Sequence, residues 1–402
     1  MYLLLAAGAS PPSTAAEPTG DVSAITLVEQ RSIDIGDGRL IALSPDGEAI
    51  AVSRPAGPEA SEVCIHDVAT LEQRLCADVR NLSAGLWVDS VVWSPDSQWL
   101  AFAELWPMYL VDGDLWLMDA STGGLTNLLD DGYDGVLDLT PAEGSEREGV
   151  ITLPMYPTFT PDSAGVTFSR TAVQAGEIRG ADIATVPITG GDPVTLGGTE
   201  REDLEGEYRS KDWTADGSAL FASLVEYSES GLGPDSGIWV FGAGGEEARQ
   251  VAGLTDPDDW PPRLIRVSPR GEHLLVVDPT SVGRFSASYA LVDGTSGGVE
   301  PIETLGAKAS RSMPFSGVRL SPDGLLLLTL SSGHGKQVAV RDLSGSNEKV
   351  LLTEPTGASP SDLAGAVLTW ADNDVVLVGG YTGGRGTLLF LDREGHDGGA
   401  GK

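Results

Sequence analysis

The amino-acid sequence predicts an all-β protein with the architecture of a seven-bladed β-propeller, and three observations lead to this prediction. A short phrase of the form Ser-Pro-Asp-Gly recurs seven times along the 402 residues, at spacings of 50 to 66 residues. An apolar strand follows each copy, and further short strands fill the rest of each period. Seven repeats of four antiparallel strands are typical of a propeller ring.

Each copy of the phrase has the chemistry of a tight turn. Proline sets φ at the second turn position, aspartate hydrogen-bonds nearby backbone amides, and Gly or Ser follows where φ can turn positive. Copy four has Ala215 in place of proline, and copy five has Arg270 in place of aspartate. The seventh copy keeps little beyond Trp370. These departures weaken single turns and leave the number of repeats unchanged.

The two ends of the repeat array predict how the ring closes. The seventh unit ends near residue 392 without a fourth strand, while residues 24–30 form an N-terminal run with no blade of its own. We therefore predict that 24–30 completes blade seven, which removes exposed strand edges. The propeller domain is expected over residues 21–394, after a segment over 1–20 and before a flexible tail over 395–402.

The turn phrase with its following apolar strand resembles the repeat of the TolB-type propellers, a WD40-like family with a Pro-Asp (PD40) motif. The resemblance covers about residues 24–392 and implies the propeller fold. It leaves the function open, because the family includes partner-binding periplasmic proteins, propeller modules of peptidases and some sugar-acting enzymes.

The charge of the chain excludes one large class of partner. Acidic residues number 59 and basic residues 25, for a net charge of −34. Such a surface repels phosphate backbones and anionic lipid, so we expect no nucleic-acid binding. The sequence contains no apolar run of about 18 residues, so we expect no transmembrane helix in the mature chain. We expect a monomer.

The N-terminal residues resemble an export signal. Residues 2–9 form a short apolar run that ends in a small-residue pattern, and 10–14 form a Pro/Ser/Thr tether. No basic segment precedes the run. We expect a secreted or periplasmic, cell-envelope location, and the alternative is a disordered apolar N-terminus on a cytosolic protein.

The two cysteines support export. Cys64 and Cys76 lie in two strand-like runs on either side of a turn near Thr70. A hairpin folded at that turn brings them to nearly facing positions, within the reach of a disulfide, which persists in oxidising compartments. Two separate buried thiols are the alternative.

The sequence contains no motif to which we assign catalysis. Residues 294–298 match the Gly-x-Ser-x-Gly pattern, but a nucleophile elbow needs a helix after the serine, and here another strand follows. Oligogalacturonate lyase-like relatives of this propeller hold a metal mainly through His. The four His of this chain are scattered, so such a cluster is hard to assemble: His66, His273, His334 and His396.

Two acidic loops are candidate calcium sites. Asp130 and Asp134 lie in the first, which has no acidic residue at the third position of an EF-hand loop and has Pro141 at the twelfth. Asp256 and Asp258 lie in the second. We expect ordinary acidic loops and no cofactor, with a loose Ca²⁺ site as the alternative.

The longer loops predict a binding face. In a propeller, the loops that lead into a blade and those between its second and third strands open on one face, opposite the Ser-Pro-Asp-Gly turns. Aromatic and arginine residues beside proline-stiffened loops are typical of partner-binding hot spots. The candidate contact residues are Trp106, Tyr109, Tyr133, Tyr156, Tyr208, Arg209, Trp260 and Arg263. The alternative for Trp106 and Trp260 is that they fill gaps between blades.

Two hypotheses for function remain. The first is an exported, non-enzymatic propeller that binds a protein or cell-envelope ligand through the face with the long loops. The second is a lyase or hydrolase that acts on a polysaccharide at the mouth of the central channel through paired carboxylates. A sensory or subunit role in a larger complex is a further alternative to both.

Overall fold

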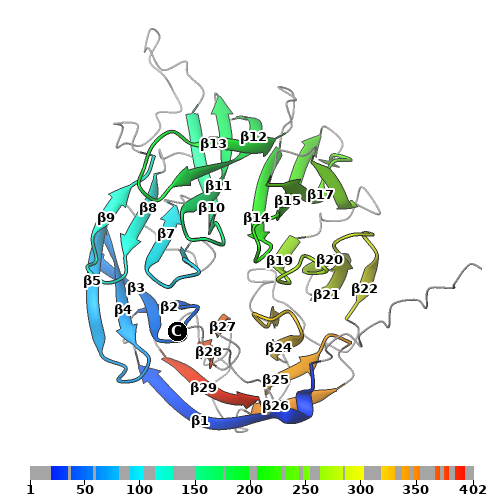
Figure 1. Ribbon diagram of the computed structural model, residues 1–402. Helices are drawn as coiled ribbons and strands as arrows, with labels where there is room; N and C mark the ends of the chain where they lie inside the picture. Colours follow the sequence, from blue (N-terminus) through cyan, green and yellow to red (C-terminus); the bar gives the residue numbers. More distant parts are fainter. Residues whose placement is uncertain are drawn as a thin grey trace, which may run out of the picture.

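The computed structural model confirms the predicted ring of seven antiparallel sheets (Figure 1). The structure describes residues 20–34, 38–57, 60–80, 91–103, 114–129, 151–174, 177–198, 206–228, 231–243, 248–253, 263–283, 286–302, 318–330, 337–344, 347–353, 367–371, 375–379 and 385–393. Within these ranges the single helical element is a 3₁₀ turn, η1 (Val22–Ala24). No helix of the described residues is long and apolar enough to cross a membrane.

The sheets follow the chain in order, with the four strands of each blade running from the ring axis outward (Figure 1). Blade one contains β2 (Arg39–Leu43), β3 (Ala49–Gly57), β4 (Ala60–Asp67) and β5 (Gln73–Arg80). Blade two contains β6 (Val91–Trp93), β7 (Trp99–Ala103), β8 (Leu115–Asp119) and β9 (Leu125–Asn127). Blade three contains β10 (Ile151–Phe159), β11 (Gly165–Gln174), β12 (Glu177–Pro187) and β13 (Val194–Gly198).

The remaining blades repeat this pattern with one addition. Blade four contains β14 (Gly206–Trp213), β15 (Ala219–Ser228), β17 (Gly237–Gly242) and β18 (Arg249–Gly253), and the short β16 (Gly231–Leu232) pairs with β15. Blade five contains β19 (Arg263–Val267), β20 (His273–Gly283), β21 (Ser286–Asp293) and β22 (Val299–Pro301). Blade six contains β23 (Val318–Leu320), β24 (Leu326–Leu330), β25 (Gln337–Asp342) and β26 (Glu348–Thr353).

Blade seven joins the two ends of the chain, as predicted. It contains β27 (Val367–Ala371), β28 (Val375–Gly379), β29 (Arg385–Arg393) and, as its outermost strand, β1 (Ile25–Asp34). β1 is longer than the predicted 24–30 because it pairs with β29 along its whole length, from Ile25 opposite Arg393 to Asp34 opposite Arg385. The ring is therefore closed by backbone hydrogen bonds.

The innermost strands line the ring axis (Figure 1). Each contacts the next around a complete circle, in the order β2, β6, β10, β14, β19, β23, β27 and back to β2. Both faces of each sheet pack against neighbouring blades, and apolar clusters fill these interfaces. One cluster, for example, joins Leu117 of blade two to Phe159 and Phe168 of blade three.

The repeated turns have the predicted hydrogen bonds. In blade one the Ser44 hydroxyl donates to Asp46 Oδ1 at 2.5 Å, and the same oxygen accepts the Glu48 amide at 2.9 Å. The same serine or threonine to aspartate bond recurs in blades two, three, four and six. In blade four, hydrogen bonds from the Ser218 amide and hydroxyl and from the Thr214 hydroxyl lower the pKa of Asp216 to about 2.

Two turns carry serine where glycine is usual, and this serine links neighbouring blades. Ser97 and Ser163 have φ values of 60° and 59°. The Ser97 hydroxyl accepts the Asp46 amide of blade one at 3.1 Å, and the Ser163 hydroxyl accepts the Asp96 amide of blade two at 3.1 Å. These inter-blade hydrogen bonds offset the cost of a positive φ in a residue other than glycine.

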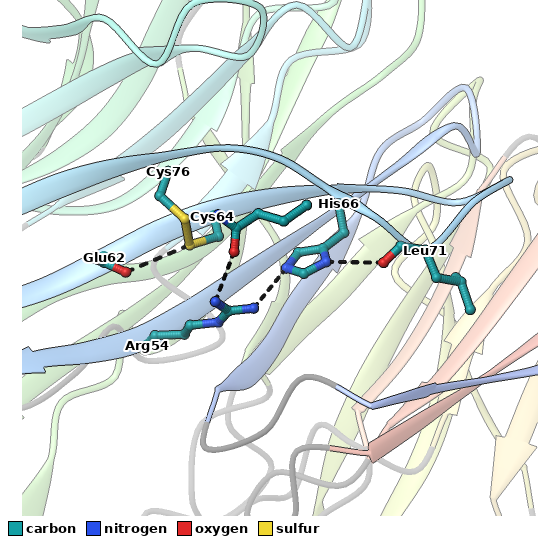
Figure 2. Close-up of a disulfide and its surroundings, with 7 residues drawn as sticks. Arg54, Glu62, Cys64, His66, Leu71 and Cys76 are labelled. Carbon is teal, nitrogen blue, oxygen red and sulfur yellow. Dashed lines mark hydrogen bonds between the residues drawn. A yellow bond between two sulfur atoms is a disulfide. The ribbon is translucent and has the colours of Figure 1, made fainter.

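The predicted disulfide is present in blade one (Figure 2). Cys64 of β4 and Cys76 of β5 lie directly opposite each other, with Cα atoms 4.0 Å apart. Their separation of 12 residues gives a loop whose closure stabilises the fold by about 3 kcal/mol. The alternative of two separate thiols is wrong for this structure.

A histidine beside the disulfide is held in its neutral form (Figure 2). Arg54 donates from Nη2 to His66 Nε2 at 3.1 Å and from Nη1 to Gln73 Oε1 at 2.8 Å. Because arginine only donates, Nε2 is the accepting nitrogen, and Nδ1 carries the proton and donates to the Leu71 carbonyl at 3.4 Å. Burial lowers the pKa of His66, the Leu71 hydrogen bond opposes this, and the Arg54 cation lowers the pKa further.

We predict that shortening a buried side chain of the closing strand destabilises the ring. Ile25 is fully buried, so Ile25→Ala should lower the free energy of unfolding by about 2–4 kcal/mol through lost packing. Val28 lies in the same strand and is 67% exposed, so Val28→Ala is the matched control and should change it by less than about 0.5 kcal/mol. Chemical denaturation monitored by tryptophan fluorescence measures both, and equal effects would contradict the predicted role of β1.

We predict that His66 makes the fold less stable in mild acid. Its pKa lies below 6.5 in the folded chain and near 6.5 in the unfolded chain, so the unfolded chain binds more protons between these values. The contribution of neutral His66 to the free energy of unfolding is complete above pH 6.5, and it is lost as the pH falls through the pKa of the folded chain. Thermal unfolding from about pH 7.5 to about pH 5 should therefore show a smaller loss of Tm for His66→Gln than for the natural chain. Parallel pH profiles would contradict the prediction.

Candidate functional site

Buried charge is concentrated in blade four. The buried acidic and lysine side chains of the described residues are Asp114, Glu207, Lys211 and Glu226, and the last three belong to this blade. Burying a charged group costs free energy unless hydrogen bonds or ion pairs compensate it. The inner strand of blade four, with its neighbours, is therefore the candidate functional site.

Two β-bulges bring polar groups together on adjacent inner strands. In β10 the register shifts between Met155 and Thr158, and in β14 it shifts between Tyr208 and Lys211. Tyr156 lies within the first bulge and has a φ of 50°. An extra residue in a strand reverses the alternation of its side chains beyond that point. As a result, Tyr208 and Lys211 both point toward blade three.

Lys211 clamps the two bulges together. Its Nζ donates to the Tyr156 carbonyl at 2.5 Å and to Ser169 Oγ at 2.8 Å. The Met155 and Arg209 carbonyls each lie 3.4 Å from the same nitrogen. Burial lowers the pKa of Lys211 well below its ordinary value, whereas these oxygen acceptors favour the charged ammonium. The side chain thus fixes the backbone of β10 relative to β14.

Tyr208 completes the packing on the blade-three side. Its side chain is 1% exposed and meets Phe241 edge to face, with ring centroids 5.6 Å apart. Ser169 Oγ donates to the Tyr208 carbonyl at 2.5 Å. Burial raises the pKa of Tyr208, and the negative charges of Asp235 and Asp182 raise it further. Tyr208 thus holds the blades together and presents no surface to a partner in this structure.

Arg209 is the cation that this cluster brings toward solvent. Its Nε donates to Glu207 Oε1 at 2.5 Å, and the side chains are 23% and 1% exposed. The buried carboxylate orients the guanidinium. On the other side of this strand Asp212 Oδ2 lies 3.3 Å from Arg266 Nε and accepts the Val267 amide at 3.0 Å. This second ion pair joins blades four and five.

The structure brings together three of the predicted contact residues: Tyr156, Tyr208 and Arg209 lie on neighbouring strands around Lys211. Arg263 begins the inner strand β19, and its side chain lies outside the described residues. The other predicted residues lie outside the described ranges, namely Trp106, Tyr109, Tyr133, Trp260, Asp130, Asp134, Asp256 and Asp258. The Ca²⁺ site therefore stays a prediction.

Sequence reasoning missed Glu207 and Lys211. The signal was present as alternating charges, Glu-x-Arg-x-Lys, in the strand that leads into the fourth turn. Such alternation also suits a solvated strand face, and only the contacts across the blade interface distinguish the two.

A concave region lies on the face of the repeated turns. A groove of about 1340 Å³ is bordered by η1 and by the turns of blades five and six, including Arg270, His273, Asp323 and Lys349. Burial raises the pKa of Asp323, but hydrogen bonds from Ser321 and Leu325 and the Arg393 cation lower it by more. The predicted contact residues whose side chains the structure describes, Tyr156, Tyr208 and Arg209, do not line this groove.

Comparisons with known proteins show the fold alone. No protein-family model matches the chain, and no curated protein matches its sequence. Three similar solved structures each have a TM-score of 0.53. The β-propeller domain of Cps50 (Swd1) from Myceliophteria thermophila is 14% identical and matches over 90% of this chain and 99% of its own.

The other two similar structures are enzymes. Oligogalacturonate lyase from Vibrio parahaemolyticus is 11% identical and matches over 93% of this chain and 98% of its own. A prolyl endopeptidase is 13% identical and matches over 90% of this chain, which spans about half of the endopeptidase, 51%. The seven-bladed fold is thus shared with proteins of different functions, and it does not identify the function of this chain.

We predict that the Lys211 clamp contributes strongly to stability. Lys211→Met keeps the length of the side chain but leaves buried carbonyl and hydroxyl oxygens without their donor, so it should lower the free energy of unfolding by about 2–3 kcal/mol. Arg270→Met is the control, because Arg270 is 83% exposed on a turn. Chemical denaturation measures both, and a loss below about 0.5 kcal/mol for Lys211→Met would contradict the clamp.

Proposed function

We propose that this protein is an exported, non-enzymatic propeller that binds a protein or cell-envelope ligand at the long-loop end of the ring axis. In this proposal Tyr156 and Arg209 belong to the contact surface. The observation that supports it most directly is the Lys211 clamp, in which one buried side-chain nitrogen contacts the backbone carbonyls of both residues.

The clamp supports binding because it holds these groups in place before a ligand arrives. A binding surface on rigid strands loses less conformational entropy on association than one on loose loops. The inner strand of blade four also keeps a buried carboxylate, Glu207, whose ion pair positions Arg209. Blade four thus buries charged groups although their burial opposes folding, and this pattern is typical of functional sites.

Two further features support this proposal. The resemblance of the turn repeat to TolB-type propellers agrees with partner binding in the cell envelope. The Cys64–Cys76 disulfide agrees with an oxidising compartment outside the cytoplasm. The likeness to oligogalacturonate lyase keeps the polysaccharide-acting enzyme as the competing hypothesis, which the test must address.

We predict that Arg209 and Tyr156 are required for ligand capture. Immobilised protein should retain a defined component from a cell-envelope extract, and Arg209→Glu and Tyr156→Ala should each weaken retention by about tenfold or more. Arg270→Glu, on the turn face, is the control and should have no effect. Quantitative mass spectrometry of the retained proteins and glycans measures this outcome.

The same protein should show no turnover of polysaccharide. Incubation with polygalacturonate, followed by absorbance of unsaturated products and by a reducing-end assay, distinguishes a lyase from a hydrolase. Product formation would overturn the non-enzymatic proposal. Equal retention by the natural chain and Arg209→Glu would overturn the assignment of the surface.

A further inference from the structure

The innermost strands differ in charge from the rest of the molecule. The whole chain carries a net charge of −34. The seven inner strands carry two acidic residues, Glu207 and Asp212, and more basic ones. The six basic residues are Arg39, Arg209, Lys211, Arg263, Arg266 and Arg319. Among the charged side chains that the structure describes on these strands, Glu207 and Lys211 are buried, whereas Arg209, Arg266 and Arg319 are at least partly exposed. The exposed charge of these strands is therefore mainly positive inside an acidic protein.

Three of these charged residues occupy equivalent positions in consecutive blades. Asp212, Arg266 and Arg319 each lie two residues before the first residue of the repeated turn. The strands that carry them are neighbours, because β14 contacts β19 and β19 contacts β23 (Figure 1). The fold therefore places an Asp–Arg–Arg sequence along one arc of the ring, at one height above the turns.

At one end of this arc a carboxylate and a guanidinium form an ion pair. Asp212 Oδ2 pairs with Arg266 Nε at 3.3 Å, and the Val267 amide holds the same carboxylate oxygen at 3.0 Å. The Arg266 side chain is nevertheless 54% exposed. On its other side the next strand carries a second arginine, the half-buried Arg319, whose Nη1 donates to the Val318 carbonyl at 3.0 Å.

We propose that a carboxylate from a short acidic peptide segment of a partner protein binds at the axis side of Arg266 and Arg319. This inference rests on the proposed function, and it names the chemistry of the ligand. A carboxylate there would repeat on the Arg319 side of Arg266 what Asp212 does on the other side. The planar guanidinium fork matches the two oxygens of a carboxylate, which favours this anion.

The charge of the rest of the molecule favours a short segment over a long polyanion. The Debye length is about 8 Å at physiological ionic strength, so a short acidic peptide segment bound at the axis is screened from most of the acidic surface of the propeller. A long polyanion would extend over that surface and be repelled by it. The exposed arginines of the inner strands also raise the local positive potential, which raises the association rate of the acidic segment.

Fluorescence anisotropy with two labelled peptides tests the inference. The acidic probe is three repeats of Asp-Glu, and the matched neutral probe is three repeats of Asn-Gln. We expect the natural chain to bind the acidic probe at low salt, to bind the neutral probe at least about tenfold more weakly, and to release the acidic probe at about 0.5 M salt. Arg266→Gln and Arg319→Gln should each weaken acidic-probe binding by about tenfold or more.

The control is Arg270→Gln, four residues after Arg266 on an exposed turn, which should bind the acidic probe like the natural chain. Similar binding of both probes by the natural chain would overturn the inference, and so would an equal loss in the Arg270 variant. Displacement of the acidic probe by digalacturonate at equal concentration would overturn the peptide assignment in favour of a uronic acid. The probe and salt comparisons use the natural chain, so they hold even where a variant does not fold.

The outcome can be separated from that of the proposed function. Failure of the acidic probe to bind, together with envelope capture that Arg209→Glu abolishes, overturns this inference and leaves the binding function standing. Loss of both probe binding and capture overturns both.

Discussion

The pairing of β1 with β29 is the constraint on which the rest of the structure depends. Residues from the two ends of the propeller share one sheet, so backbone hydrogen bonds hold the ring closed. Every blade then has a neighbour on each face, and the apolar clusters between blades are buried from both sides. Without this pairing, blade seven would expose an edge and the interface beside blade one would lose its alignment.

Closure gives the inner strands a common geometry. The repeated turns end each inner strand at the same relative point, and serine or threonine bonds to aspartate hold five of these turns in one conformation. Residues at the same distance from their turns therefore lie in one layer around the axis. This layering places Asp212, Arg266 and Arg319 side by side on strands that are about 50 residues apart in sequence.

Within this regular frame, blade four is the exception. It buries Glu207, Lys211 and Glu226, groups whose dehydration opposes folding. Lys211 compensates part of this cost by binding oxygens from three strands, β10, β11 and β14. As a result, the inner strands β10 and β14 are held rigidly against each other. Strands fixed in this way can hold Arg209 and Tyr156 in one arrangement, which is what the proposed binding surface requires.

The sequence by itself determined the number of blades, the position of their turns, the closure by the N-terminal strand and the pairing of Cys64 with Cys76. These features depend on local turn chemistry and on strand periodicity, both of which are encoded over a few residues. The clamp and the ion pairs across blades depended on tertiary structure. In an unbroken strand Tyr208 and Lys211, three residues apart, would point to opposite faces. The bulge between them places both on the blade-three side, and no residue pattern signals that bulge. The blade-three partners of Lys211 lie more than 40 residues away in sequence and meet it only because the ring brings blade three against blade four.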